Sequence, residues 1–198
     1  MNHELKPNSG ILLINLGTPD SADVADVRRY LGEFLMDPFV LSAPTIIRAL
    51  IVYGFILPFR PNKSAEAYAS IWTDEGSPLL TGSQRLADEL AAELQAPVVL
   101  SMRYGNPSIQ AGIEELAAQG VEHIIVVPLY AQHADSTVTT SLRAVEAALP
   151  ATMQHSVLPP FYGADEHSQA WGELIKQHLP EQWDHLLLSY HGLSLIHI

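Results

Sequence analysis

The sequence predicts an α/β fold in which a parallel, doubly wound sheet carries helices on both faces. Continuous apolar runs are typical of parallel strands that are covered on both sides. Four such runs occur, at residues 11–16 (ILLINL), 97–100 (PVVL), 124–129 (IIVVPL) and 186–190 (LLLSY). Residues 153–158 are a weaker candidate. Amphipathic stretches separate the runs, and strands that alternate with helices favour right-handed crossovers.

Five stretches between these runs place apolar residues at helical spacing. The first begins after the polar pair Asp20 and Ser21. The third follows Ser108, a residue type that caps helices, and Gly120 is a natural stop for it. The five apolar stripes are Val27, Leu31, Phe34 and Leu35; Leu86, Leu90 and Leu94; Ile109, Ile113 and Leu116; Val138, Leu142, Val145 and Leu149; and Trp171, Leu174, Ile175 and Leu179.

The composition fits a folded, acidic protein. The 198 residues are 47% hydrophobic and 16% charged, which suffices to bury a core and argues against disorder. Lys and Arg number 10 against 22 Asp and Glu, a formal net charge of −12. We therefore expect no nucleic-acid partner, because binding phosphates needs clustered basic residues. The chain has no cysteine, which excludes disulfides and thiolate metal sites within it.

The length suits one large domain, or one domain with part of a second. Prolines at positions 150, 159 and 160 mark the best candidate for a domain crossing. We therefore assign residues 1–150 to a first domain and residues 151–198 to the start of a second. The polar first ten residues lack the layout of a signal peptide, which makes a cytoplasmic location the expectation.

An apolar run covers residues 38–59, and Arg48 is its only charged residue. The run approaches the length of a membrane span. However, Pro44, Arg48, Gly54 and Pro58 interrupt it, and the sequence contains no second run of this kind. An apolar lip, or an amphipathic helix that lies on a surface, fits this pattern better than a transmembrane helix.

Ligands of doubly wound sheets bind beyond the carboxyl ends of the strands, so the residues after each run are candidates. Gly17 after the first run allows either a close approach to a ligand or an ordinary strand-to-helix turn. After the second run, Arg103 suits a carboxylate and Tyr104 a flat ligand face; the alternative is a solvated Arg and a half-buried Tyr. No GxGxxG or P-loop pattern occurs, so nucleotide binding has no support.

Polar groups also follow the two later runs. Residues 130–137 (YAQHADST) precede a helix whose unpaired N–H groups attract anions, although capping by Asp135 or Ser136 would use the same groups. His191 ends the last run before a glycine, and an imidazole can accept a proton or bind a metal near neutral pH. A lone histidine is more often structural, and His133 is a second candidate. The absence of HxxxH and HExxH spacing argues against a closed zinc site.

Taken in order over residues 10–193, these motifs resemble those of the ferrochelatase family. Each motif is weak alone, whereas the ordered set is specific. The motifs are ILLINLGTP at 11–19, VRRYLGEFLMDPFV at 27–40, KSAEAYASIW at 63–72 with GSPL at 76–79, the pair Arg103 and Tyr104, PLYAQHADST at 128–137 and SYHGL at 189–193.

The resemblance implies two Rossmann-like domains around a porphyrin cleft, and a lyase that inserts Fe2+ into protoporphyrin IX or coproporphyrin III in heme biosynthesis. It implies that His191 accepts pyrrole protons and contacts the metal. Iron would be a substrate, with no tightly bound cofactor. Residues 41–59 would form a lip that holds the macrocycle and makes a peripheral membrane contact. Porphyrin-binding roles are implied for Tyr68, Arg103, Tyr104, Leu16 and Ser77.

The chain departs from the family pattern at three motif positions. Ala131 replaces a proline, His133 replaces a tyrosine, and Ser194 replaces the proline of the last motif. The family continues through a second half, which supplies the carboxylate partner of the histidine. We therefore expect that the chain is truncated at its C-terminus and that residues 195–198 are unrelated to the family.

Three other interpretations stay open at this point. The first is a related chelatase that inserts cobalt or nickel into another tetrapyrrole, and metal preference would discriminate it. The second is a porphyrin-binding module without catalysis, which would bind porphyrin and insert no metal. The third is a membrane-associated protein without chemistry, for which residues 41–59 are the only supporting feature.

Overall fold

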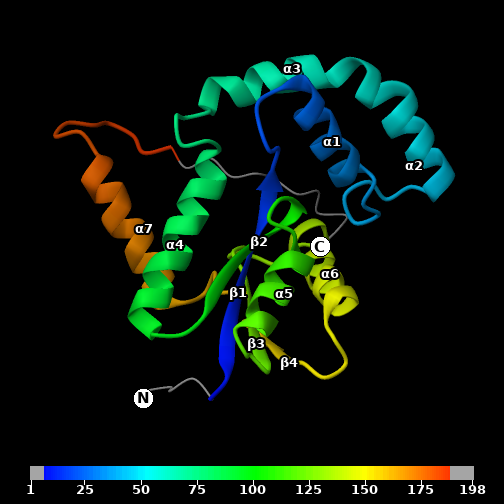
Figure 1. Ribbon diagram of the computed structural model, residues 1–198. Helices are drawn as coiled ribbons and strands as arrows, with labels where there is room; N and C mark the ends of the chain where they lie inside the picture. Colours follow the sequence, from blue (N-terminus) through cyan, green and yellow to red (C-terminus); the bar gives the residue numbers. More distant parts are fainter. Residues whose placement is uncertain (1–6, 188–198) are drawn as a thin grey trace.

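A computed structural model describes residues 7–187 and contains a four-stranded parallel sheet in the order β2-β1-β3-β4 (Figure 1). The strands are β1 (Ser9–Thr18), β2 (Val98–Gly105), β3 (His123–Pro128) and β4 (Gln154–Val157). β1 pairs with both β2 and β3 and is therefore central. The predicted α/β class with a parallel sheet is confirmed.

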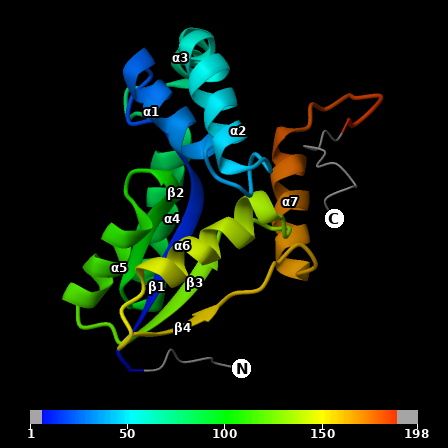
Figure 2. The ribbon, with the colours of Figure 1, turned by 90° about the vertical axis from the view of Figure 1, so that its right-hand side faces the viewer.

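β1 is buried on both faces because its side chains point alternately to two helix layers. Leu12 and Ile14 pack in the apolar cluster of α5 (Ile109–Ala118) and α6 (Thr140–Ala148). Ile11 and Leu13 pack instead with Ala87 of α4 (Pro78–Leu94). Figure 1 shows α4 on one side of the strands and α5 on the other, and Figure 2 looks onto the sheet from the side of α6. The continuous apolar run thus reflects two covered faces.

A further group of helices lies beyond the carboxyl ends of the strands. α1 (Val24–Leu35) follows β1, while α2 (Thr45–Ile51), a π-helical segment η1 (Val52–Ile56) and α3 (Leu57–Ile71) follow one another without a break. Figure 1 shows these helices at the end of the sheet toward which β1 points. A second π-helical segment, η2 (Asp135–Thr139), leads into α6, and α7 (Asp165–His178) follows β4. The candidate site residues after β1 and β2 therefore face the helices α1 and α3.

Four of the five predicted strands are confirmed, including the weaker candidate that became β4. The fifth, at residues 186–190, is not: Leu186 and Leu187 lie outside any strand, and residues 188–190 lie outside the described residues. The predicted ends of α5 are confirmed. The Ser108 hydroxyl accepts from the Ala111 N–H at 3.2 Å, and Gly120 has a φ of 79°.

Two helix predictions need correction. All five predicted helices exist, but the buried face of α4 is centred on Ser83 and Ala87, whereas Leu86 and Leu94 are 38% and 41% exposed. The cap of η2 is Ala134 and not Asp135 or Ser136. A third finding concerns α7, which buries none of its residues in the described part of the chain.

The expected domain boundary between residues 150 and 151 is misplaced. β4 begins at Gln154 and pairs in parallel with β3, so it completes the same sheet. The prolines at 159 and 160, which come directly after this strand, fit a crossing better than Pro150 does. A second domain beyond this point stays a prediction.

The apolar segment of residues 41–59 is folded into a loop, α2, η1 and the start of α3. Its only charged residue, Arg48, is buried and donates to the carbonyl oxygens of Ala43 at 2.7 Å and Leu41 at 3.4 Å. No helix among residues 7–187 is long and apolar enough to cross a membrane. Large apolar side chains are at least half exposed on this segment: Ile46, Ile47, Leu50, Tyr53, Phe55 and Phe59.

Gly17 is required by the protein's own backbone. Its φ is 114°, and a Cβ atom at this position would lie 1.9 Å from the carbonyl oxygen of Tyr104, its partner across β1 and β2. Of the two interpretations left open, the geometry favours the strand-to-helix turn, because close packing of the strand ends accounts for the glycine without a ligand. Gly105, with a φ of 80°, makes the same kind of approach to the Thr18 carbonyl.

Gly17→Ala is expected to lower the free energy of unfolding by at least about 2 kcal/mol, because the new methyl group meets backbone and the φ is strained. Urea unfolding followed by circular dichroism measures it. The control is Gly82→Ala in α4, where a Cβ atom meets nothing within 4 Å. That change should raise stability by about 0.5–1 kcal/mol, since alanine favours a helix interior. Equal effects of the two substitutions would contradict the close approach at Gly17.

Candidate functional site

The carboxylate of Asp37, just beyond the end of α1, is the centre of a hydrogen-bond cluster at the carboxyl ends of the strands. Its Oδ2 accepts from Arg103 Nη2 at 2.5 Å, from the Tyr104 hydroxyl at 2.9 Å and from the Thr140 hydroxyl at 2.5 Å. Its Oδ1 accepts from the N–H of Phe39 at 2.7 Å. The side chain is 3% exposed. One buried carboxylate therefore joins the end of α1, the end of β2 and the start of α6.

The cluster fixes the protonation states of its members. Burial opposes ionisation of Asp37, but hydrogen bonds from Thr140, Phe39 N–H and Tyr104, with the charge of Arg103, outweigh it and hold the pKa of Asp37 below its usual value. Burial raises the pKa of Tyr104 far above its usual value, although Thr140 and Arg103 oppose this. Near neutral pH the cluster thus combines an ionised carboxylate, a guanidinium cation and a neutral, donating phenol.

The expectations for Arg103 and Tyr104 need correction. Arg103 pairs with a carboxylate as predicted, but the partner is the protein's own Asp37, and the Arg103 side chain is 20% exposed rather than solvated. Its Nε donates to the Thr140 hydroxyl at 2.8 Å, and its guanidinium carbon lies 4.4 Å from the centroid of the Tyr104 ring. Tyr104 is fully buried, because its hydroxyl points inward to Asp37. It therefore supports the site from behind and does not line an open ligand face.

Aromatic rings connect Tyr68 of α3 to Tyr104. The Tyr68 and Tyr30 rings meet edge to face with centroids 6.2 Å apart, Tyr30 stacks on Phe34 at 6.1 Å, and Phe34 meets Tyr104 edge to face at 5.2 Å. Leu16 packs against the same cluster. Each such aromatic pair contributes about 0.5–1.5 kcal/mol beyond the area it buries. The fold thus gathers four predicted site residues in one place: Leu16, Tyr68, Arg103 and Tyr104.

The other predicted site residues are not brought to this cluster by the described contacts. Ser77 is buried at the N-cap position of α4, and its hydroxyl makes no capping hydrogen bond. His191, the predicted proton acceptor, lies outside the described residues. His133 is more than half exposed and lies 3.2 Å from the Thr139 hydroxyl and 3.8 Å from Asp135. Within residues 7–187, no group of three or more His, Cys, Asp or Glu could hold a metal ion.

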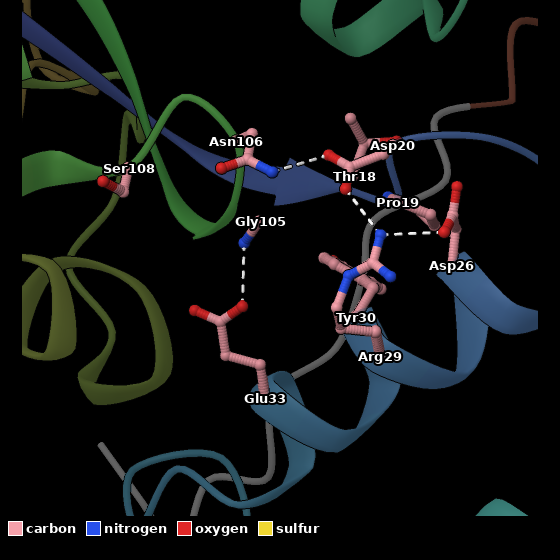
Figure 3. Close-up of a pocket in the computed structure, with 10 residues that line it drawn as sticks. All are labelled: Thr18, Pro19, Asp20, Asp26, Arg29, Tyr30, Glu33, Gly105, Asn106 and Ser108. Atoms are coloured by element: carbon pink, nitrogen blue, oxygen red, sulfur yellow. Dashed lines mark hydrogen bonds and ion pairs between the residues drawn. The ribbon is translucent and has the colours of Figure 1, made fainter. Parts of the chain in front are cut away.

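A pocket of about 300 Å³ opens between the ends of β1 and β2 and the outer side of α1 (Figure 3). Its charged side chains satisfy one another and the backbone. Arg29 pairs with Asp20 at 2.7 Å and with Asp26 at 2.8 Å, and Glu33 accepts from the Gly105 N–H at 3.0 Å. Tyr30, on the rim, donates to the Gly17 carbonyl at 3.2 Å. None of the predicted site residues lines this pocket, so it is distinct from the Asp37 cluster.

Sequence reasoning gave no role to Asp37, Thr140 or Tyr30. A signal for Asp37 was present, since it is the only charge in the apolar run FLMDPFVL, and a buried charge requires a partner. The identity of that partner was not available from the sequence, because Arg103 is 66 residues away. Thr140 and Tyr30 carry no comparable signal.

Comparisons with known proteins agree with the resemblance drawn from the motifs. The family model described as Ferrochelatase matches residues 8–198. The chain is 50% identical over 192 residues to a protein named Ferrochelatase from Pseudomonas syringae pv. syringae (strain B728a). It is 49% identical to the protein of the same name from Azotobacter vinelandii and 48% identical to that from Ectopseudomonas mendocina. Each match covers 95% of this chain and 56% of the relative, so the chain spans just over half the length of these proteins.

Asp37→Asn is expected to lower the free energy of unfolding by about 2 kcal/mol at pH 7, because it removes charge-assisted hydrogen bonds from a buried site. The loss should depend on pH. Since the pKa of Asp37 is lowered by folding, its ionised form stabilises the protein above the unfolded pKa of about 3.9, and this contribution is lost as pH falls through the folded pKa. Urea unfolding from pH 3 to pH 7 should show the gap between parent and variant at its largest above about pH 5 and narrowing below pH 4.

The control for this measurement is Glu146→Gln, which breaks the exposed pair with Arg143 on α6. Exposed pairs contribute little, so the control should follow the parent at every pH. A gap between parent and Asp37→Asn that stays constant down to pH 3 would show that folding does not lower the pKa of Asp37.

Proposed function

The chain belongs to the ferrochelatase family, and from this membership we propose that it is part of an enzyme that inserts Fe2+ into a porphyrin in heme biosynthesis. The observation that carries the proposal is the match of the family model over residues 8–198. The gathering of four motif residues around one cluster at the carboxyl ends of the strands supports it, because ligands of such sheets bind there. In terms of reaction class the enzyme would be a lyase.

The reaction exchanges two pyrrole N–H protons of the porphyrin for one metal ion. A base must take up these protons while Fe2+ binds the four ring nitrogens, so that charge and atoms balance. We assign the base to His191 of the SYHGL motif, which accepts one pyrrole proton at a time near neutral pH and passes it to solvent water before it accepts the second. A contact to the arriving metal is assigned to the same side chain in its neutral form, because only neutral imidazole has a lone pair free for iron. Iron is a substrate in this proposal, and no tightly bound cofactor is needed.

The described residues would hold the porphyrin. Leu16 and Tyr68 offer apolar surface for a flat ring, and Arg103 offers a cation for a carboxylate side chain. Ser77 is a further proposed contact, from its place in the GSPL motif. Apolar walls exclude water from the ring nitrogens, which favours transfer of the metal from its hydration shell. Either protoporphyrin IX or coproporphyrin III has the flat ring and the carboxylates that these residues suit.

We propose a cytoplasmic location with a peripheral membrane contact through residues 41–59. The supporting observation is the row of exposed apolar side chains on α2, η1 and α3, which includes Ile46 at 85% and Phe59 at 77% exposure. Exposed apolar residues gathered on one segment mark a surface that binds an apolar partner. A hydrophobic product or substrate would enter or leave such a site from the bilayer.

Replacing His191 by alanine is expected to reduce the rate of iron insertion by at least about 100-fold while porphyrin binding persists, because the change removes the general base. Binding is followed by titration of the Soret absorbance and insertion by the loss of porphyrin fluorescence. Both assays use the 198-residue chain and the same chain extended by the part of the P. syringae relative that the match leaves uncovered. The control is His155→Ala, an exposed histidine on β4.

Three outcomes would decide between the proposal and its alternatives. Normal insertion by His191→Ala would remove the assigned role of this residue. Insertion of cobalt or nickel, with no activity toward iron, would favour the related chelatases. Binding of porphyrin without insertion of any metal, even by the extended chain, would favour a porphyrin-binding module without catalysis.

Replacing Ile46, Phe55 and Phe59 together by serine is expected to reduce binding to phosphatidylcholine–phosphatidylglycerol vesicles by at least about tenfold. Transferring one such side chain from water to an apolar phase is worth about 1.5–3 kcal/mol, and tenfold corresponds to about 1.4 kcal/mol. The unfolding midpoint should stay unchanged, because the three side chains are 65–85% exposed. Vesicle flotation measures binding, with Leu94→Ser on α4 as the control. Equal flotation of the triple variant and the control would exclude this surface as the membrane contact.

A further inference from the structure

We infer that Asp37 is a positioning residue of the porphyrin site, which acts by holding Arg103 toward a carboxylate side chain of the porphyrin. The inference rests on the proposed function and extends it to a residue outside the substrate contacts assigned above. Asp37 is buried behind Arg103 and, in the described residues, reaches the site only through the hydrogen bonds of the cluster.

The two oxygens of the carboxylate serve two separate segments. Oδ2 receives the donors of the strand end and of α6, whereas Oδ1 receives the N–H of Phe39. The backbone carbonyl of Asp37 also accepts from the N–H groups of Val40 and Leu41 at 3.1 and 3.0 Å. Asp37 therefore binds the guanidinium of Arg103 through Oδ2. Through Oδ1 and its backbone carbonyl, it accepts hydrogen bonds from residues 39–41, where the apolar segment begins.

Two of the three side-chain nitrogens of Arg103 donate hydrogen bonds within the cluster. Nη2 donates to Asp37, Nε donates to Thr140, and the guanidinium plane lies against the Tyr104 ring. Nη1 donates no hydrogen bond to any residue between 7 and 187, and the side chain keeps 20% of its surface exposed. A guanidinium fixed in this way presents its remaining N–H groups in one direction and is pre-organised for a planar acceptor such as a carboxylate.

Thr140 explains why an ionised carboxylate is needed at position 37. Its hydroxyl accepts from Arg103 Nε and donates its own proton to Asp37 Oδ2. Because Arg103 Nη2 and the Tyr104 hydroxyl donate to the same oxygen, Oδ2 must accept three hydrogen bonds. An asparagine can keep its carbonyl oxygen toward Phe39 N–H, but it then turns an N–H group toward Arg103. Asp37→Asn should therefore preserve the turn after α1 and release the guanidinium.

Kinetics of Asp37→Asn test the inference. Loss of the preset guanidinium should raise the KM for the porphyrin by about tenfold and change kcat by less than about threefold, because the interaction acts on binding and not on proton transfer. With the fully esterified porphyrin, which has no ionised side chain, the difference between parent and variant should disappear. Parent, Asp37→Asn, Arg103→Gln and the double variant are compared in the extended chain, with Glu146→Gln as the control that breaks an exposed pair.

The double variant separates positioning from a merely structural role. If Asp37 acts through Arg103, Asp37→Asn should change the KM little in the Arg103→Gln background, a non-additive result. Additive effects on KM, a loss confined to kcat, or an unchanged difference with the fully esterified porphyrin would each overturn the inference. If Asp37→Asn does not fold, Thr140→Val removes the second anchor of Arg103, and it should raise the KM in the same direction by about threefold.

Failure of the proposed function looks different from failure of the inference. If the parent binds porphyrin without inserting iron, the Kd from Soret titration replaces KM, and the same ratios between variants are expected. If the parent neither binds nor metallates porphyrin, the proposed function falls and the inference falls with it. If the parent is active and Asp37→Asn matches it in KM, only the inference is overturned.

Discussion

The buried carboxylate of Asp37 is the interaction on which the carboxyl end of this sheet depends. A carboxylate removed from water is stable only where several donors replace the water, and here four donors do so. The requirement constrains distant parts of the chain. α1 has to end where Asp37 can turn inward, β2 has to carry an arginine and a tyrosine just before its last residue, Gly105, and α6 has to begin with a threonine. Removing any one donor would leave the others around an under-satisfied charge, so the segments are fixed as a set.

The strand ends must also lie close enough for this set to form, and Gly17 provides for that. Without a side chain, Gly17 lets the Tyr104 carbonyl come to a position that any Cβ atom would occupy. The carbonyl of Gly17 then accepts the hydroxyl of Tyr30, which stacks on Phe34 and meets Tyr68. Two hydrogen bonds thus position the aromatic cluster: Tyr30 donates to the Gly17 carbonyl, and Tyr104 donates to Asp37.

The fold was more predictable from the sequence than the site was. Continuous apolar runs identified β1 to β3 because burial on two faces leaves a direct mark on composition. β4 (QHSV) has four exposed residues and was only a weaker candidate. The spacing of Leu86 and Leu94 misplaced the buried face of α4, since small residues, Ser83 and Ala87, pack closest to the sheet. The motifs identified Arg103 and Tyr104, but their roles followed from a partner 66 and 67 residues away, which no local pattern encodes. The role of His191 stays a prediction.

In the apolar segment after Asp37, large apolar side chains are exposed and the charged side chain is buried, the opposite of the usual arrangement. Hydrogen bonds of the segment maintain this arrangement. Ile46, Leu50 and Phe59 face outward, while the only cation, Arg48, is buried. Arg48 donates to the Leu41 carbonyl, and the Leu41 N–H in turn donates to the Asp37 carbonyl. Turning the segment over to hide its apolar residues would break these bonds and strand a buried cation without acceptors, a cost that opposes collapse onto the core. The hydrogen bonds that hold Arg103 and those that keep the apolar surface outward therefore meet at one residue, Asp37.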